Sequence, residues 1–348
     1  MQAVLLEEKG HISLGDFAID ETLGDDDVRI KPMSVGICGS DVHYYREGRI
    51  GDFVVEKPMV LGHEAGGVVV EAGRNVRTLK VGDRVCMEPG IPDFKSPETL
   101  RGMYNINPDV KFWATPPVHG CLRETVVHPA CLTFPIPETM SFDEGALVEP
   151  VAIGVYSVEK ARVAPGDSAL IIGAGTIGIV TALAAEASGC APVILADVKR
   201  EKLDFVESLY GDRIRTVHAT GRGLPEDLAD MGVSGVDLVF EASGAAAAYP
   251  DITRCLKPGG KAVFIGMPSG PVSLDIVAMQ VKEIATMSIF RYVNAFPKTV
   301  SLIGSGKMAV APLVTKRFPF AQAADAFAYA ATLPAGEVKI MIDMSDGI

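Results

Sequence analysis

The sequence predicts an α/β protein with a β-rich domain and a second domain built on a doubly wound parallel sheet. Three observations support this fold class. The 348 residues exceed what one ordinary core encloses, so two domains are expected. Residues 3–149 consist of short apolar runs broken by turns, which is typical of β-rich folds. Beyond Pro165, Gly166 and Asp167, strand-like and helix-like segments alternate, which indicates a parallel sheet.

Each part contains segments with clear strand patterns. In the β-rich part, strands are expected at 27–30, 67–71 and 84–87. In the alternating part, they are expected at 169–172, 193–196, 236–241 and 262–266.

The last segment returns to a mixed texture. It contains an expected strand at 314–318, an alanine-rich helix at 321–333 and a final strand at 338–342. We expect this segment to rejoin the first domain. The predicted division is therefore a discontinuous β-rich domain of residues 1–152 and 291–348, interrupted by a parallel-sheet domain of residues 153–290.

The charge balance favours a small-molecule partner. The formal net charge of -12 and the pI near 5.0 would repel nucleic-acid phosphates and acidic membrane surfaces, so neither is expected as a partner. The six cysteines form no Cys-x-x-Cys pair, as in a reduced intracellular protein. The N-terminal residues do not resemble a secretory signal. We therefore expect a cytoplasmic protein.

A dinucleotide-binding motif follows the expected strand at 169–172. Gly173, Gly175 and Gly178 form a Gly-x-Gly-x-x-Gly pattern between a strand and a helix, the context that a Rossmann domain requires. Asp197 ends the next strand, where a carboxylate binds the ribose hydroxyls and repels a 2′-phosphate, so NAD is favoured over NADP. The alternative is a glycine-rich turn beside an unrelated surface aspartate.

Other side chains are expected to line the cofactor. Lys202, together with Lys199 and Arg200, weakens the preference for NAD, because a cation near Asp197 can tolerate a phosphate. The remaining expected cofactor-binding residues are Thr176, Ile177, Ile265, Met267 and Phe290.

Three stretches supply side chains of the kinds that bind metal ions. They contain Cys38, the pair His63 and Glu64, and Glu149. Each residue alone is more often a core or surface residue, and only their joint occurrence suggests a site. A thiolate, an imidazole and one or two carboxylates suit zinc, and three protein ligands leave a fourth position open, as in catalytic zinc sites.

The sequence resembles the zinc-dependent medium-chain dehydrogenase/reductase family. The signature runs from Gly62 to Gly67, through Gly73 and Val76, to the run 82–85, and the resemblance extends through the glycine motif to Asp197. It implies a GroES-like catalytic domain that binds zinc and a Rossmann domain that binds NAD. Further stretches are similar to sorbitol and xylitol dehydrogenases, namely 36–45, 48–51, 57–61, 114–117 and 290–292.

The resemblance also implies residue roles. Cys38, His63 and Glu64 correspond to the catalytic zinc ligands, and Glu149 is either a ligand or a partner of the water on the zinc. Ser40 and His43 match the family's proton relay, although a serine and a histidine at this spacing can equally cap a helix. Tyr44, Arg291 and Glu149 are candidates for binding polyol hydroxyls, and Phe53, Phe112 and Phe290 for an apolar wall, unless these phenylalanines simply belong to the core.

One part of the family pattern is missing. Many relatives hold a structural zinc on four cysteines, and that spacing falls here on Asp93, Ser96, Thr99 and Asn107. Because these side chains cannot replace four thiolates, we expect one zinc per chain, no structural zinc, and a lobe held by packing alone. The resemblance also suggests a homotetramer.

The predicted function is NAD-dependent, zinc-dependent oxidation of a polyol to a ketose, either xylitol to D-xylulose or sorbitol to fructose. One alternative uses the same machinery on another secondary alcohol, such as 2,3-butanediol or threonine. A second alternative, from a different class, is a non-catalytic nucleotide-binding protein.

Overall fold

The chain folds into two compact units. The computed structural model describes residues 1–332, 334 and 336–345. The first unit comprises Met1–Glu149 and Phe296–Ile348, and the second comprises Pro150–Ala295. Helix α3 (Phe142–Ala161) begins in the first unit and continues in the second. Within the described part of the chain, no helix combines the length and the apolar character that a membrane span requires.

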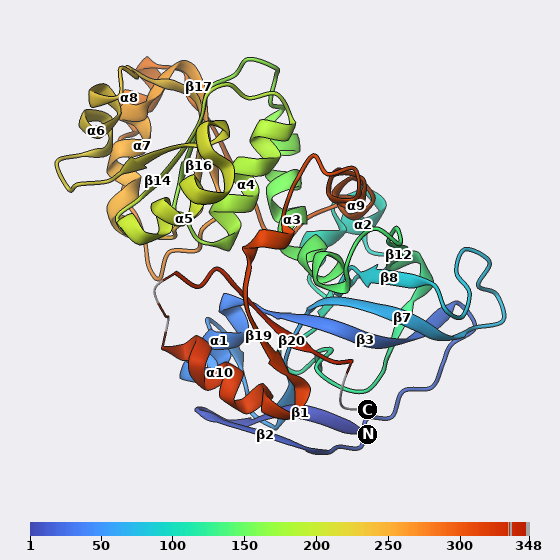
Figure 1. The fold of residues 1–348 in the computed structure, drawn as a ribbon. Coiled ribbons are helices and arrows are strands. Elements are labelled where there is room, and N and C mark those ends of the chain that lie inside the picture. Colours follow the sequence, from blue (N-terminus) through green and yellow to red (C-terminus); the bar gives the residue numbers. More distant parts are fainter. Residues whose placement is uncertain (333, 335, 346–348) are drawn as a thin grey trace. The chain divides into compact units, whose positions relative to one another are not determined.

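The first unit is built mainly from strands (Figure 1). Its strands are β1 (Gln2–Glu8), β2 (His11–Asp16), β3 (Asp27–Ile37), β4 (Arg49–Ile50), β5 (Phe53–Val54), β6 (Met59–Val60), β7 (Glu64–Ala72), β8 (Arg84–Met87), β9 (Gly90–Ile91), β10 (Lys111–Phe112), β11 (Val126–Pro129), β12 (Thr133–Pro135), β19 (Val314–Pro319) and β20 (Lys339–Asp343). Its own helices are α1 (Gly39–Glu47), α2 (Pro97–Leu100), α9 (Phe296–Gly304) and α10 (Ala323–Ala331).

A seven-stranded sheet organises this unit. Six strands follow the order β12-β8-β7-β3-β20-β19, and β11 pairs with β3. Strand β3 is central because it pairs with β7, β20 and β11. Its side chains alternate in their first part, where Val28 and Ile30 are fully buried and Arg29 between them is more exposed. Strand β20 pairs antiparallel with β3, so the C-terminal segment contributes a strand to the sheet of the first unit.

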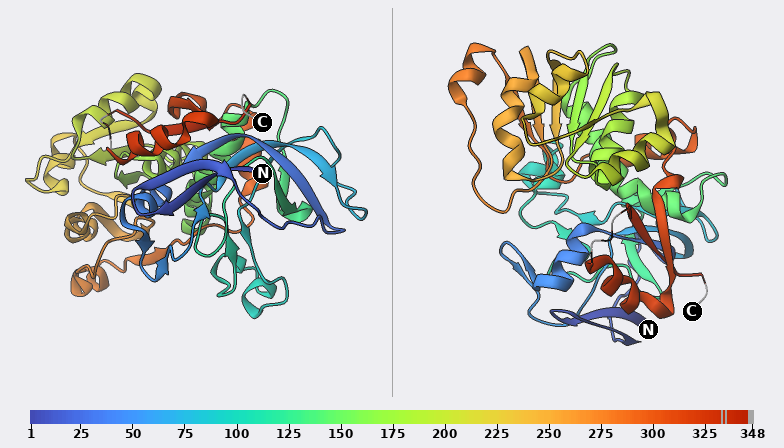
Figure 2. Two further views of the ribbon diagram at one scale, coloured as in Figure 1. Left: turned by 90° about the horizontal axis from the view of Figure 1, so that it is seen from below. Right: turned by 60° about the vertical axis from the view of Figure 1, so that its left-hand side comes forward.

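The second unit contains a six-stranded parallel sheet. Its elements are β13 (Ala169–Ile172), α4 (Thr176–Ala187), β14 (Val193–Asp197), α5 (Arg200–Tyr210), β15 (Arg215–His218), α6 (Leu224–Asp230), β16 (Val236–Glu241), α7 (Tyr249–Cys255), β17 (Leu256–Phe264), α8 (Ile276–Val281) and β18 (Ala285–Ser288). The right-hand view of Figure 2 shows helices on both faces of this sheet.

The strand order of the parallel sheet places its ligand-binding edge. The order is β15-β14-β13-β16-β17-β18, so the chain turns back between β13 and β16. Ligands of doubly wound sheets bind where the order reverses, at the carboxyl ends of the strands. Strand β13 is completely buried, as expected of a central parallel strand covered on both faces.

Some predicted boundaries differ from the structure. Strand β17 begins at Leu256 rather than at residue 262, because Leu256 already pairs with Val236 before an irregularity in the ladder. The helix predicted at 321–333 begins at Ala323, after a short 3-10 turn at Phe320–Gln322, and ends at Ala331. Its predicted last residue, Leu333, lies outside the described residues.

Candidate active site

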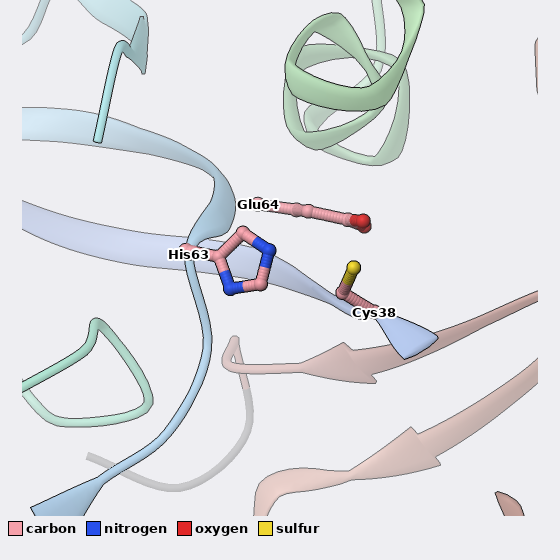
Figure 3. Close-up of side chains that lie close together, drawn as sticks. All are labelled: Cys38, His63 and Glu64. Atoms are coloured by element: carbon pink, nitrogen blue, oxygen red, sulfur yellow. The ribbon is translucent and has the colours of Figure 1, made fainter. Parts of the chain in front are cut away.

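Three predicted metal ligands come together in the first unit. Cys38, His63 and Glu64 each offer one ligand atom, and these atoms lie within 4.8 Å of one another. Figure 3 shows the Cys38 sulfur and the Glu64 carboxylate reaching toward the same space, with the His63 ring beside them. Cys38 lies between β3 and α1, and Glu64 begins β7, whose pairing with β3 brings the three residues together.

Asp41 holds two of these ligands in place. Its carboxylate accepts hydrogen bonds from the backbone N–H groups of Cys38 at 3.0 Å and Gly62 at 3.1 Å. The same carboxylate lies 3.6 Å from Nδ1 of His63. Burial alone would lower the pKa of His63, but the charges of Asp41 and Cys38 raise it well above its usual value. Asp41 therefore orients the imidazole and increases its basicity.

Glu64 is paired with a lysine from the far end of the chain. Lys339, the first residue of β20, donates from Nζ to Oε1 of Glu64 at 2.7 Å and to Oε2 at 2.6 Å. It also donates to the backbone oxygen of Ile37 at 3.2 Å. The side chains of Lys339 and Glu64 are only 3% and 1% exposed. Burial opposes the charge of Lys339, but Glu64, Cys38 and Glu149 together raise its pKa.

Gly36 leaves room for this ion pair. It lies on β3, where it pairs with Glu64 on β7 and with Met341 on β20. A Cβ atom at this position would overlap the Glu64 carboxylate. The absence of a side chain at Gly36 therefore lets Glu64 reach across β3 toward Lys339.

Glu149 lies outside this group of three. Among the described residues, the group of converging metal-ligand atoms consists of Cys38, His63 and Glu64 alone. Glu149 is buried within α3, and its charge acts on both Lys339 and Glu88. Burial raises the pKa of Glu88 to about 7, a hydrogen bond from Tyr104 opposes this rise, and the charge of Glu149 adds to it.

The predicted substrate-binding and relay residues of the first unit include one side chain that contacts a metal ligand and three that follow Cys38 on α1. The Phe112 ring packs 5.6 Å from the His63 ring, measured between centroids. Ser40, His43 and Tyr44 lie on α1, which begins directly after Cys38; Tyr44 is buried and His43 is exposed. Cys38 itself occupies the N-cap of α1, with Asp41 accepting from its N–H, so the capping role considered for Ser40 and His43 belongs to these residues instead.

The glycine motif of the second unit has the geometry that phosphate binding requires. Gly173 adopts a φ of 105°, which favours glycine. A Cβ on Gly175 would meet open space at the start of α4, whereas one on Gly178 would overlap the backbone oxygen of Gly173. The second glycine therefore leaves space for a ligand at a helix N-terminus, and the third permits close packing of helix and strand.

Asp197 lies at the same edge of the sheet. Its carboxylate accepts hydrogen bonds from the N–H groups of Ala174 at 2.7 Å and Lys199 at 2.8 Å. Lys202 Nζ lies 3.9 Å from Asp197 Oδ2. A cavity of about 330 Å³ opens here, and its lining includes Gly173, Asp197 and Ser243. An acidic side chain fixed beside the glycine loop suits a ribose.

The remaining predicted ligand contacts of this unit follow β17 and β18. Met267 is 73% exposed and Phe290 is 43% exposed. Ile265 donates its N–H to the backbone oxygen of Glu241, at the end of β16. Arg291 has a φ of 55°, and its guanidinium lies 4.8 Å from the centre of the Phe290 ring.

Comparison with known proteins identifies the family. Residues 24–138 match the alcohol dehydrogenase GroES-like domain, and residues 176–305 match the zinc-binding dehydrogenase domain. The chain is 52% identical to a D-xylulose reductase of Morganella morganii over 95% of its own length and 98% of that protein. It belongs to the zinc-dependent medium-chain dehydrogenase/reductase family.

Two further similarities agree with membership of this family. A sorbitol dehydrogenase of Arabidopsis thaliana is 39% identical over 93% of this chain and 90% of that protein. A solved oxidoreductase/dehydrogenase of unknown specificity from Escherichia coli superposes with a TM-score of 0.92 at 32% identity, covering 99% of each chain. The predicted family, its polyol dehydrogenase branch and the two-part fold class are thereby confirmed.

The lobe that carries four cysteines in many dehydrogenases of this family is held differently here. The side chain of Asn107 accepts from the N–H of Asp93 at 2.9 Å, and Ser96 Oγ donates to Thr99 Oγ1 at 3.0 Å. Ser96 also caps α2 through the N–H of Thr99. The expectation of a lobe held by packing alone was therefore wrong, because Ser96 and Thr99 are hydrogen-bonded through their side chains and the side chain of Asn107 binds the backbone of Asp93.

Two residues near the metal ligands were not assigned a role from sequence. Asp41 stands in the conspicuous run after Cys38, and its position three residues later was a usable signal for a capping carboxylate. Lys339 carried no such signal, because a single lysine at the start of a C-terminal strand is ordinary.

Proposed function

We propose that this protein oxidises a secondary hydroxyl of a polyol to a ketose with NAD, converting xylitol to D-xylulose, sorbitol to fructose, or both. The convergence of Cys38, His63 and Glu64 carries the proposal, because it supplies a catalytic-type ligand set in a chain related over nearly its whole length to a D-xylulose reductase. A non-catalytic nucleotide-binding protein would have no need of this cluster.

The donor set fits zinc. A thiolate, an imidazole and a carboxylate are the ligands that zinc accepts, and three protein ligands leave one position open. When bound there, zinc supplies a Lewis acid that lowers the pKa of a hydroxyl group. We propose one zinc per chain and no structural zinc, since the lobe presents Asp93, Ser96, Thr99 and Asn107 in place of thiolates. Glu149 serves either as a further ligand or through an intervening water.

The chain's own residues would then bind the substrate and move its proton. We assign proton transfer toward solvent to Ser40 and His43, and hydroxyl binding to Tyr44, Arg291 and Glu149. Phe112, packed beside His63, would shield the reacting carbon from water.

The cofactor proposed for the second unit is NAD. Gly173, Gly175, Thr176, Ile177 and Gly178 would bind the pyrophosphate through the N-terminus of α4, and Asp197 the adenosine ribose. Lys202, Ile265, Met267 and Phe290 would complete the site. We assign residues 1–152 and 291–348 to catalysis and 153–290 to NAD binding, and we propose a cytoplasmic homotetramer.

A substrate panel tests this function. Formation of reduced cofactor is followed with xylitol, sorbitol, 2,3-butanediol and threonine, with NAD or NADP, and with or without a zinc chelator. Chelator-sensitive oxidation of the polyols with NAD is the expected result. Activity confined to butanediol or threonine would transfer the function to another secondary alcohol and leave Tyr44 and Arg291 without their roles. Turnover that is insensitive to prolonged chelation would contradict the zinc assignment.

A further inference from the structure

Two of the candidate zinc ligands each lie beside a buried charged residue, and these two residues carry opposite charges. His63 is backed by the buried carboxylate of Asp41, 3.6 Å from its Nδ1. Glu64 is backed by the buried ammonium of Lys339, which donates to both of its carboxylate oxygens. A carboxylate behind an imidazole increases the basicity of that ligand. An ammonium behind a carboxylate has the opposite effect, because it withdraws negative charge from the donor atoms.

The ammonium and a metal ion would share the same carboxylate. Both oxygens of Glu64 accept from Lys339, yet the carboxylate also lies within the 4.8 Å cluster formed with Cys38 and His63. Each carboxylate oxygen keeps a second lone pair, so sharing is possible, but two cations then compete for one unit of negative charge.

Lys339 is fixed independently of Glu64. Its Nζ also donates to the backbone oxygen of Ile37, and β20 is hydrogen-bonded to β3 from Ile340 to Asp343. The ammonium therefore has a partner to retain if the carboxylate turns toward a metal ion. Both backbones lie in the sheet, and it is the bond to Ile37 that gives the Lys339 ammonium a partner other than Glu64.

We propose that Lys339 is a positioning residue that competes with the metal for the Glu64 carboxylate, making Glu64 the weak and exchangeable member of the ligand set. This inference rests on the proposed zinc site. Cys38 and His63 then supply most of the affinity, and removal of the Lys339 charge tightens metal binding.

Zinc affinity, measured by competition with a chromogenic chelator, tests this proposal on the full-length chain. Lys339→Met removes the charge at similar volume, and we expect it to bind zinc about ten-fold more tightly than the wild type. Lys339→Arg retains the charge and should stay within about two-fold of the wild type. The matched control is Lys282→Met, which removes a lysine of the second unit that donates to the backbone oxygens of Thr253 and Leu256. It should leave zinc affinity unchanged.

A double-mutant cycle separates competition for Glu64 from a general charge effect. In a Glu64→Gln background, Lys339→Met should change zinc affinity much less than it does in the wild type, because the shared carboxylate is gone. An equal gain in both backgrounds would contradict competition for Glu64. If Lys339→Met lowers the thermal unfolding temperature too far for the measurement, Lys339→Gln removes the charge and retains a hydrogen-bond donor, and the same tightening is expected.

The outcomes distinguish this inference from the proposed function. With Co²⁺ in place of zinc, the wild type should show a thiolate-to-cobalt charge-transfer band that Cys38→Ser abolishes. If the band is absent, the metal site of the proposed function fails. If the band is present but Lys339→Met binds zinc equally or more weakly, the proposed function stands and the competition by Lys339 is overturned.

Discussion

The absence of a side chain at Gly36 allows the Glu64 carboxylate to reach its place in the ligand cluster. Its position on β3, between Glu64 and Met341 on the neighbouring strands, requires that no side chain stand in the path of the Glu64 carboxylate. A Cβ atom at Gly36 would displace mainly the carboxylate end of the flexible Glu64 side chain. It would also lie 3.2 Å from the Cβ atom of Glu64. The geometry of one metal ligand therefore depends on a residue that cannot itself bind a metal.

Gly36→Ala is expected to redirect Glu64 without unfolding the chain. The displaced carboxylate would lose its hydrogen bonds to Lys339, at a cost of about 1–3 kcal/mol in the free energy of unfolding. Denaturant unfolding and zinc affinity measure the two effects. Gly15→Ala is the matched control, because Gly15 also lies in a strand and a Cβ there meets nothing within 4 Å. Equal behaviour of the two variants would contradict the role of Gly36.

His128 provides a pH-dependent contribution to stability. It is completely buried, its Nε2 donates to the backbone oxygen of Glu88, and burial lowers its pKa to about 4. Between about pH 4 and pH 6.5 the unfolded chain takes up a proton that the folded chain does not. His128 therefore lowers stability as the pH falls through this window, by up to about 3 kcal/mol.

Glu88 acts in the opposite direction over part of the same range. Its folded pKa of about 7 exceeds the usual 4.5, so its contribution to stability is lost as the pH rises through 7. Replacing His128 by Phe should remove its contribution to the pH dependence of the free energy of unfolding and leave that of Glu88. We expect unfolding measurements to show that the stability difference between wild type and His128→Phe changes steadily from about pH 4 to pH 6.5. His11→Gln, at an exposed position, should not reproduce this change.

At the scale of elements, α4 depends on two glycines in different ways. Gly178 lies against the backbone oxygen of Gly173, so Gly178→Ala must push the helix away from β13. We expect a loss of about 1–3 kcal/mol in stability together with weaker NAD binding.

Gly175→Ala meets open space and should unfold as the wild type does, but its methyl group would occupy room needed by the pyrophosphate. Thermal unfolding and fluorescence titration with NADH measure both variants. A normal NADH affinity for Gly175→Ala would contradict the assignment of this loop.

The elements that could be predicted from sequence are those with local patterns. Strand β13, the glycine loop and α4 follow one another directly, so periodicity and motif identify them together. Cys38, His63 and Glu64 could be selected because each stands in a recognisable run. Lys339 could not, because 275 residues separate it from Glu64 and only the pairing of β20 with β3 makes them neighbours. The hydrogen bonds of the lobe were missed because the missing cysteines indicated what could not bind there, not what would replace them.

At the scale of the whole molecule, the number of zinc ions per chain tells whether the protein has one metal site or two. Three converging ligand residues, and a lobe with Asp93, Ser96, Thr99 and Asn107 where many family members have cysteines, lead us to expect one zinc per chain. Elemental analysis of the purified protein checks this expectation, and Cys38→Ser should reduce the content toward zero. Ser96→Ala should leave the zinc content unchanged while costing about 1 kcal/mol through the lost cap of α2. A content near two per chain would show a second site.

The place of β20 in the sheet has a consequence for synthesis on the ribosome. The section of β3 that precedes Cys38 takes its neighbour on one side from β7 and on the other from β20, which is translated some three hundred residues later (Lys339 and Ile37 are 302 residues apart). The whole second unit, Pro150–Ala295, emerges in between and can fold while that edge of β3 still lacks its partner. An open strand edge invites pairing with other chains. A nascent chain of this protein therefore carries an aggregation-prone edge through most of its elongation, and the same late strand that covers it delivers the lysine that neutralises Glu64.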